Sequence, residues 1–129
     1  MNRVVHFEIP ADDMDRAKKF YSSVFGWAIQ DYPMPDGTKL TGITTAPVDE
    51  KTHMPKDRGA INGSMLQKTK DVFAPLVSIW VDSVDEYIKK IESAGCKVVK
   101  PKTEFVGMGF YAYVTDTEGN VMGLFESVK

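Results

Sequence analysis

The chain has 129 residues, of which 43% are hydrophobic and 26% charged, with a formal net charge of −2. These values are ordinary for a globular protein of one compact domain, and they exclude the basic surface that nucleic acid or an anionic membrane requires. A single cysteine, Cys96, excludes an internal disulfide and fits a reducing compartment. No apolar run approaches the ~20 residues of a membrane span, and the N-terminus does not read as a secretory signal. We therefore predict a cytoplasmic protein with no nucleic-acid or membrane partner.

The first half of the chain predicts one helix among four strands. Residues 4–10 form a strand that Pro10 ends, with His6 and Glu8 on one face and alternate apolar residues on the other. Asp12 and Asp13 offer an N-cap to a helix over residues 14–25, whose apolar residues recur at spacings of three and four. Further strands are predicted over residues 27–32, 39–45 and 60–67.

The second half repeats this order of elements. The pattern predicts a strand over residues 76–82, a helix over 84–94 and strands over 97–101, 110–115 and 121–126. We therefore predict an α+β protein with two β-α-β-β-β modules. They form one domain over residues 1–129, with module one at about 1–67, a linker at 68–75 and module two at about 76–129. The alternative is a ferredoxin-like or other α+β domain whose halves are alike by chance.

Several short motifs occur in an order that points to one family. They are a V-H-F-E-I opening, F-Y-x-x-V-F-G-W at residues 20–27, I-N-G-x-M at 61–65 and a D-x-x-G-N turn at 116–120 before an apolar strand. Together they resemble the vicinal oxygen chelate superfamily of glyoxalases, bleomycin-resistance proteins and extradiol dioxygenases, and within it a glyoxalase-related subgroup lacking the usual metal ligands. The resemblance implies one curled mixed sheet that forms a cup around the ligand, helices on its outer face, and a homodimer.

The resemblance also indicates where metal-dependent members hold their metal. The four matching positions are His6, Gly63, Ser78 and Gly123. An imidazole binds a divalent metal well, whereas a neutral hydroxyl is a poor ligand and glycine has no side chain. We therefore expect no metal cofactor. A divalent ion held by His6 and Glu8 is the less favoured alternative.

His6 and Glu8 are the candidate catalytic residues. Histidine titrates near neutrality and can act as a general acid or base, and a carboxylate two residues along the strand can orient it. The alternatives are a half-buried histidine bonded to a neighbouring carbonyl and a solvated glutamate.

Seven residues are candidate ligand-binding residues, because the resemblance places them on or near the cup. Aromatic side chains would suit a flat organic ligand, and the glycines would leave free space on the cup floor. The alternative is that the aromatic residues fill a closed core. Which of the two tyrosines faces inward stays open. The seven are Gly63, Met65, Ser78, Trp80, Tyr111, Tyr113 and Gly123.

Two functions remain open from the sequence. One is an enzyme of lyase or isomerase type acting on a small carbonyl compound, with His6 as acid and base. The other is a protein that sequesters a drug-like or aromatic molecule without chemistry, as bleomycin-resistance proteins do. Both require a small-molecule ligand, and neither is the standard metal-dependent glyoxalase I reaction. The sequence leaves open whether the protein is an enzyme.

Overall fold

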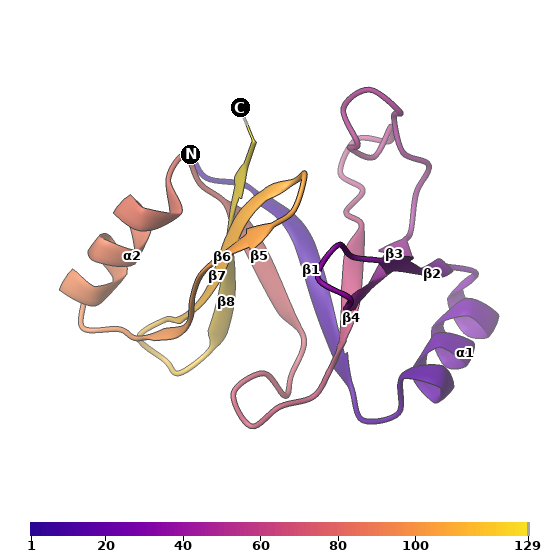
Figure 1. The fold of residues 1–129 in the computed structure, drawn as a ribbon, viewed down its shortest axis with the longest axis horizontal. Coiled ribbons are helices and arrows are strands. Elements are labelled where there is room, and N and C mark those ends of the chain that lie inside the picture. The colour runs from indigo at the N-terminus through magenta and orange to yellow at the C-terminus, as the bar shows by residue number, and fades with distance from the viewer. Residues whose placement is uncertain (129) are drawn as a thin grey trace. The chain divides into compact units, whose positions relative to one another are not determined.

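The computed structural model describes residues 1–128, and the chain divides into two compact units. The N-terminal unit is His6–Pro75, and the C-terminal unit combines Met1–Val5 with the chain from Leu76 onward. Each unit has one helix among its strands, in the same order along the chain (Figure 1). The predicted α+β class and its two β-α-β-β-β modules are therefore confirmed.

The first module forms a mixed sheet with strand order β2-β3-β4-β1. Strands β1 and β4 pair in parallel, and the other neighbours pair antiparallel. The parallel pair requires a crossover, because β1 leads into α1 and the two antiparallel strands before β4. The elements are β1 (Val4–Ala11), α1 (Met14–Phe25), β2 (Ala28–Pro33), β3 (Lys39–Thr44) and β4 (Gly63–Gln67).

The second module repeats this topology with strand order β5-β8-β7-β6. Strands β5 and β8 pair in parallel, and β8-β7 and β7-β6 pair antiparallel. Each module thus places its first and last strands side by side. The elements are β5 (Leu76–Trp80), α2 (Val84–Ser93), β6 (Val98–Phe105), β7 (Gly109–Thr115) and β8 (Val121–Ser127).

Each helix covers one face of its own sheet. In the first module, Ile43 and Met65 are buried and pack with Tyr21 from α1. In the second module, Val84 at the start of α2 packs with Leu124 from the sheet. Because successive strand residues point to opposite faces, the alternate residues of each sheet lie on the face away from its helix.

The ends of α1 are fixed by Asp13, one of the two N-cap residues that the sequence predicted, and by Gly26. Asp13 is the N-cap, and its Oδ1 accepts a hydrogen bond from the Arg16 amide at 3.0 Å. Gly26 follows the helix with φ 72°, a left-handed conformation that glycine adopts without steric cost. Asp116 closes the turn before β8 by accepting hydrogen bonds from the amides of Glu118 and Asn120. A hydrogen bond from the Asn120 side-chain amide, followed by these backbone hydrogen bonds, lowers the pKa of the Asp116 carboxyl.

Several predicted boundaries were wrong. Strand β1 continues through Pro10, and β6 runs through Pro101 as far as Phe105. The proline ring fixes a φ that an extended strand accepts, and β6 is an edge strand, where a missing N–H costs little. Strand β4 begins at Gly63, three residues later than predicted. The Asn62 side chain before it accepts hydrogen bonds from the backbone amides of Thr45 and Ala46.

Glu126 connects the last strand to the second helix. Its Oε2 accepts a hydrogen bond at 2.9 Å from the amide of Val84, the first residue of α2. The first amides of a helix have no partner within the helix and favour negative charge, so this contact joins β8 to the start of α2.

We expect Glu126→Gln to lower the free energy of unfolding by about 1 kcal/mol, because the charge at the helix start is lost. Urea denaturation measures this change. The exposed Glu118, in the turn before β8, is the control, and Glu118→Gln should change stability little. Equal effects of the two substitutions would contradict a role for the Glu126 contact.

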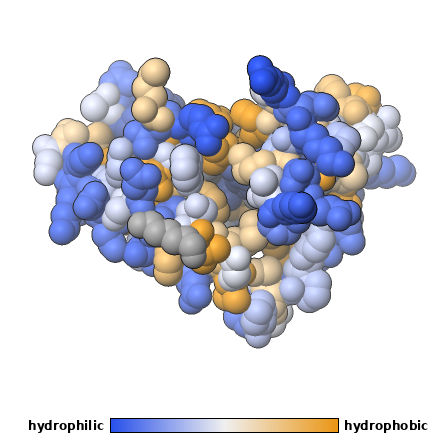
Figure 2. Space-filling view, turned by 90° about the horizontal axis from the view of Figure 1, so that it is seen from above, coloured by the Kyte–Doolittle hydropathy of each residue, from blue (hydrophilic) through white to orange (hydrophobic). Residues whose placement is uncertain are grey.

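Among residues 1–128, no helix is long and apolar enough to cross a membrane. The face drawn in Figure 2 mixes hydrophilic residues with separate apolar areas. Some of the exposed apolar side chains belong to α1, whose Phe20, Val24 and Phe25 are each more than half exposed.

Candidate functional site

The face of the first sheet away from α1 carries the two candidate catalytic residues. Strand β1 pairs with β4 so that Phe7 is opposite Gly63 and Glu8 is opposite Ser64. Phe7 packs toward α1, so the alternating His6 and Glu8 point to the other face, as the sequence predicted. Their neighbour on that face is Ser64, a residue that the sequence analysis did not select.

His6, Ser64 and Glu8 form a connected polar row. The Nε2 atom of His6 lies 3.1 Å from the Ser64 Oγ, which lies 3.4 Å from Oε1 of Glu8. Carboxylate oxygens only accept hydrogen bonds, so the Ser64 hydroxyl donates to Glu8 and accepts from the N–H at Nε2 of His6. The longer distance makes the bond to Glu8 the weaker one. Because Ser64 donates to Glu8 and accepts from His6, the His6 proton lies on Nε2, and Nδ1 is an acceptor.

Burial keeps the His6 side chain neutral. Desolvation lowers its pKa from 6.5 to about 4, because a charged imidazolium loses its hydration inside the protein. At neutral pH the ring is therefore uncharged. Among residues 1–128, no hydrogen bond to its Nδ1 atom is found. The polar row thus presents a neutral acceptor nitrogen rather than a cation.

Gly63 and Met65 are not brought together with His6 and Glu8. They lie on the opposite face of the first sheet, where Met65 is 3% exposed and packs in the core below α1. A Cβ atom added to Gly63 would meet the backbone oxygen of Phe7 and, at 2.8 Å, its ring. The space beside Gly63 is thus filled by an aromatic side chain and is not free for a ligand.

The other five ligand-binding candidates do share one surface. Gly123 pairs with Ser78 on one side and with Tyr113 on the other, and Phe125 pairs with Trp80 and Tyr111 in the same way. All lie on the face of the second sheet away from α2, which we call the aromatic face. The two tyrosines lie two residues apart and point the same way, with ring centroids 5.6 Å apart. Both tyrosines therefore lie on the same face of this sheet, a point that the sequence left open.

The aromatic face also carries two cations that the sequence analysis missed. The ammonium of Lys100 donates a hydrogen bond of 2.7 Å to the hydroxyl of Tyr111 and lies 4.9 Å from the centre of its ring. The guanidinium of Arg3 lies 5.4 Å from the centre of the Trp80 ring. Strand alternation could not predict the face on which Lys100 lies, because the register of β6 is irregular around it.

The side chains present do not fit the family's metal site. In the first sheet the register puts Ser64, rather than Gly63, on the face of His6, and in the second sheet the two family positions are the hydroxyl of Ser78 and the bare Gly123. Neutral hydroxyls are weak ligands of a divalent metal. Within residues 1–128, no group of three or more His, Cys, Asp or Glu side chains could hold a metal ion. These side chains therefore assign no role to a metal at this site.

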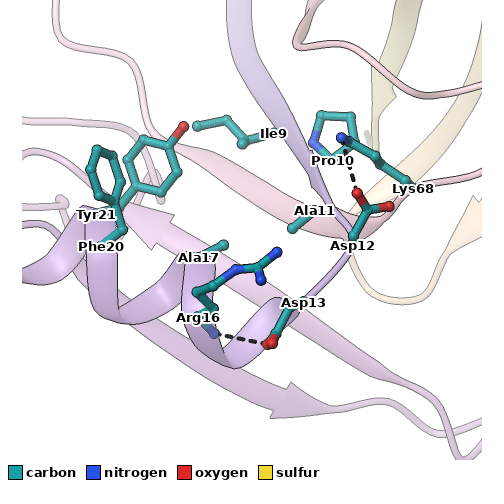
Figure 3. Close-up of a pocket in the computed structure, with 10 residues that line it drawn as sticks. All are labelled: Ile9, Pro10, Ala11, Asp12, Asp13, Arg16, Ala17, Phe20, Tyr21 and Lys68. Carbon is teal, nitrogen blue, oxygen red and sulfur yellow. Dashed lines mark hydrogen bonds and ion pairs between the residues drawn. The ribbon is translucent and has the colours of Figure 1, made fainter.

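A shallow groove lies at the end of β1 beside α1, and none of its lining residues is a candidate residue (Figure 3). Three of its four charged side chains are engaged in local structure: Lys68 pairs with Asp12 at 3.3 Å, and Asp13 caps α1. We therefore assign it no ligand. The groove is lined by Ile9, Pro10, Ala11, Asp12, Asp13, Arg16, Ala17, Phe20, Tyr21 and Lys68.

Solved structures with the same fold include several epimerases. A hypothetical protein from Bacillus halodurans aligns over 99% of this chain and 96% of its own, with TM-score 0.65 and 13% identity. Methylmalonyl-CoA epimerase from Streptomyces coelicolor aligns over 100% and 99%, with TM-score 0.65 and 16% identity. The Mycobacterium tuberculosis epimerase aligns over 98% and 88%, with TM-score 0.63 and 14% identity. Identities this low show a shared fold alone.

Sequence comparison gives the family. Proteins named "Putative glyoxylase CFP32" from Mycobacterium bovis and Mycobacterium tuberculosis are 28% identical over 126 residues. The match covers 93% of this chain and 44% of those relatives, so the chain spans less than half of their length. The family model for the glyoxalase/bleomycin resistance protein/dioxygenase superfamily matches residues 3–124. The topology, the repeat and this match agree, and the chain belongs to the glyoxalase/bleomycin resistance protein/dioxygenase superfamily.

Proposed function

We propose that this superfamily member binds a small, enolisable carbonyl compound and that His6 accepts a hydrogen bond from the enol hydroxyl of the ligand. The polar row of His6, Ser64 and Glu8 is the observation that supports the proposal. It holds His6 through Nε2 and orients an uncharged Nδ1 acceptor. A neutral acceptor in a partly buried site matches an O–H donor without the desolvation cost of a charge.

The low pKa of His6 favours binding over turnover. A general base works best when its pKa lies near the operating pH, and a histidine with a pKa of about 4 takes up a proton only weakly at neutral pH. The leading function is therefore ligand binding without chemistry, at a site that does not use the family's usual set of metal ligands.

Benzoylacetone tests this function, because it is a small neutral diketone that forms an enol. We expect His6→Gln to weaken its binding about tenfold, equivalent to ~1.4 kcal/mol, since glutamine can keep the contact to Ser64 at the Nε2 position but lacks the Nδ1 acceptor. Titration calorimetry or NMR titration measures the affinity. The control is His53→Gln, at an exposed loop position.

A second probe checks that the enol is what His6 recognises. The 2,2-dimethyl derivative of benzoylacetone cannot enolise, so it should bind weakly and equally to the wild type and to His6→Gln. The proposal is wrong if the wild type and His6→Gln bind benzoylacetone with the same affinity.

Proton transfer beside a carbonyl is the second candidate function. The epimerases that share the fold support it, as does the lone pair that the Nε2–H tautomer leaves on Nδ1 of His6. In such a step, Nδ1 removes a proton from the carbon next to the carbonyl, an enolate forms, and the imidazolium returns a proton to that carbon.

Deuterium exchange separates the two candidates. In D2O, an enzyme of this kind would introduce deuterium at the methylene of 1-phenylpropan-2-one faster than buffer does, and His6→Gln would abolish the acceleration. NMR follows the loss of the methylene signal. Exchange no faster than in buffer, together with His6-dependent binding of benzoylacetone, would leave the binding function alone.

A further inference from the structure

The aromatic face of the second module combines aromatic rings with hydrogen-bond donors, and Ser78, Tyr113 and Gly123 at its centre are buried. One cross-strand row contains Ser78, Gly123, Tyr113 and Lys100, and the next contains Trp80, Phe125, Tyr111 and Thr103. Gly123 has no side chain, and a Cβ atom there would collide with the Ser78 hydroxyl, which lies across the glycine. The Ser78 side chain therefore fills the space over Gly123, and the centre of the face presents a small hydroxyl bordered by aromatic rings, against which a flat molecule can lie.

The charge of this face has one sign. Lys100 lies against Tyr111 and Arg3 lies against Trp80, whereas none of the eight positions in the two rows is acidic. The two cations are exposed and rest on aromatic rings through cation–π contacts. A cation held in this way keeps donors for an anion, because an ammonium has three N–H groups and Lys100 gives one of them to Tyr111.

Two hydroxyl hydrogens on the face also have no acceptor. The Tyr111 oxygen accepts from Lys100, but within residues 1–128 its own hydrogen has no hydrogen-bond acceptor. Ser78 is only 6% exposed, and its hydroxyl likewise makes no hydrogen bond to the part of the chain that the structure describes. Among the described residues no buried side-chain oxygen lacks a hydrogen-bond partner, so the Ser78 oxygen retains contact with solvent and is open to a ligand acceptor.

We propose that the aromatic face binds a planar aromatic carboxylate. The Lys100 ammonium and the Tyr111 hydroxyl bind the carboxylate oxygens, and the ring of the ligand lies against Trp80 and Phe125. Charge-assisted hydrogen bonds give the selectivity for an anion, and ring contact gives most of the buried area. This assignment goes beyond the function proposed above, because it rests on different residues and on the charge of the ligand.

The test compares 2-naphthoate with 2-naphthamide, which has the same ring and no charge. The wild type should bind 2-naphthoate about tenfold more tightly, as measured by NMR titration, with the largest shifts at the Trp80 indole and the amides of β7 and β8. Lys100→Met should abolish the preference for the anion. Tyr111→Phe, which keeps the ring and removes the hydroxyl, should reduce the affinity for 2-naphthoate several-fold.

Lys97→Met is the matched control, since Lys97 is an exposed lysine immediately before β6 and should leave the preference intact. Equal affinity for the two probes, no detectable binding of either, or an unchanged preference in Lys100→Met would each overturn the assignment. The function proposed for His6 is tested with a neutral diketone and a different variant, so either proposal can fail while the other stands.

Discussion

The free energy of unfolding is expected to fall by about 3 kcal/mol through His6 alone as the pH drops from 6.5 to about 4. Burial lowers the pKa of His6 in the folded protein, whereas the unfolded chain keeps the ordinary value. Between those two pH values the unfolded chain binds a proton that the folded protein does not, so acid stabilises the unfolded state. The contribution is constant above pH 6.5 and is fully lost below pH 4.

His6→Gln should remove most of this pH dependence, since glutamine does not titrate and can still bond to Ser64. Urea denaturation at half-unit steps from pH 7 to pH 4.5 measures it. The range avoids the most strongly shifted carboxyl, because hydrogen bonds from Lys18 and Thr41 lower the pKa of Asp31 from 3.8 to about 2. Its stabilising effect is present above pH 3.8 and is lost only below that pH.

The exposed His53 provides the control for this experiment. His53→Gln should keep the full decline of stability between pH 6.5 and 4.5. A wild-type protein whose stability is flat over this range would show that His6 is not desolvated, and it would remove the main reason for treating His6 as a neutral acceptor.

Gly109→Ala is expected to lower the free energy of unfolding by about 3 kcal/mol or more. Gly109 begins β7 with φ 143°, a conformation that L residues rarely adopt, and an added Cβ would collide with the backbone oxygen of Glu126. A backbone atom cannot rotate away as a side chain can. The start of the β7-β8 pairing would therefore have to shift, and with it the contact of Glu126 to the start of α2.

Gly107→Ala separates the collision from the backbone strain. Gly107 also has a positive φ, 79°, but an added Cβ there meets nothing within 4 Å. Its replacement should cost only about 1 kcal/mol, the ordinary penalty for a left-handed alanine. Thermal unfolding of both variants gives the comparison. If both alanine variants lose the same free energy of unfolding, the backbone near Glu126 moves aside at little cost, and the predicted collision is wrong.

Local patterns carried most of the information about the fold. Strand alternation, helical spacing and the capping residues Asp13 and Gly26 are local properties of the chain, and they repeat in both halves. The β-α-β-β-β order could therefore be predicted without knowing any contact between distant residues. Strand ends at Pro10 and Pro101 were misjudged, because a proline interrupts a sheet only where its N–H is needed by a neighbouring strand.

The candidate site was predictable only as far as alternation within one strand reaches. The sequence by itself determined that His6 and Glu8 share a face, whereas it left open which of Tyr111 and Tyr113 lies on the inward face. Tertiary structure decided the pairing between strands: β1 and β4 align so that Ser64 joins His6, whereas Gly63 and Met65 turn toward α1. A shift of one residue in register reverses every side chain, and nothing local fixes that register across more than fifty residues. The contacts of Lys100 and Glu126 could not be predicted for a similar reason. The strand of Lys100 pairs irregularly, and the partner of Glu126 is the start of a distant helix.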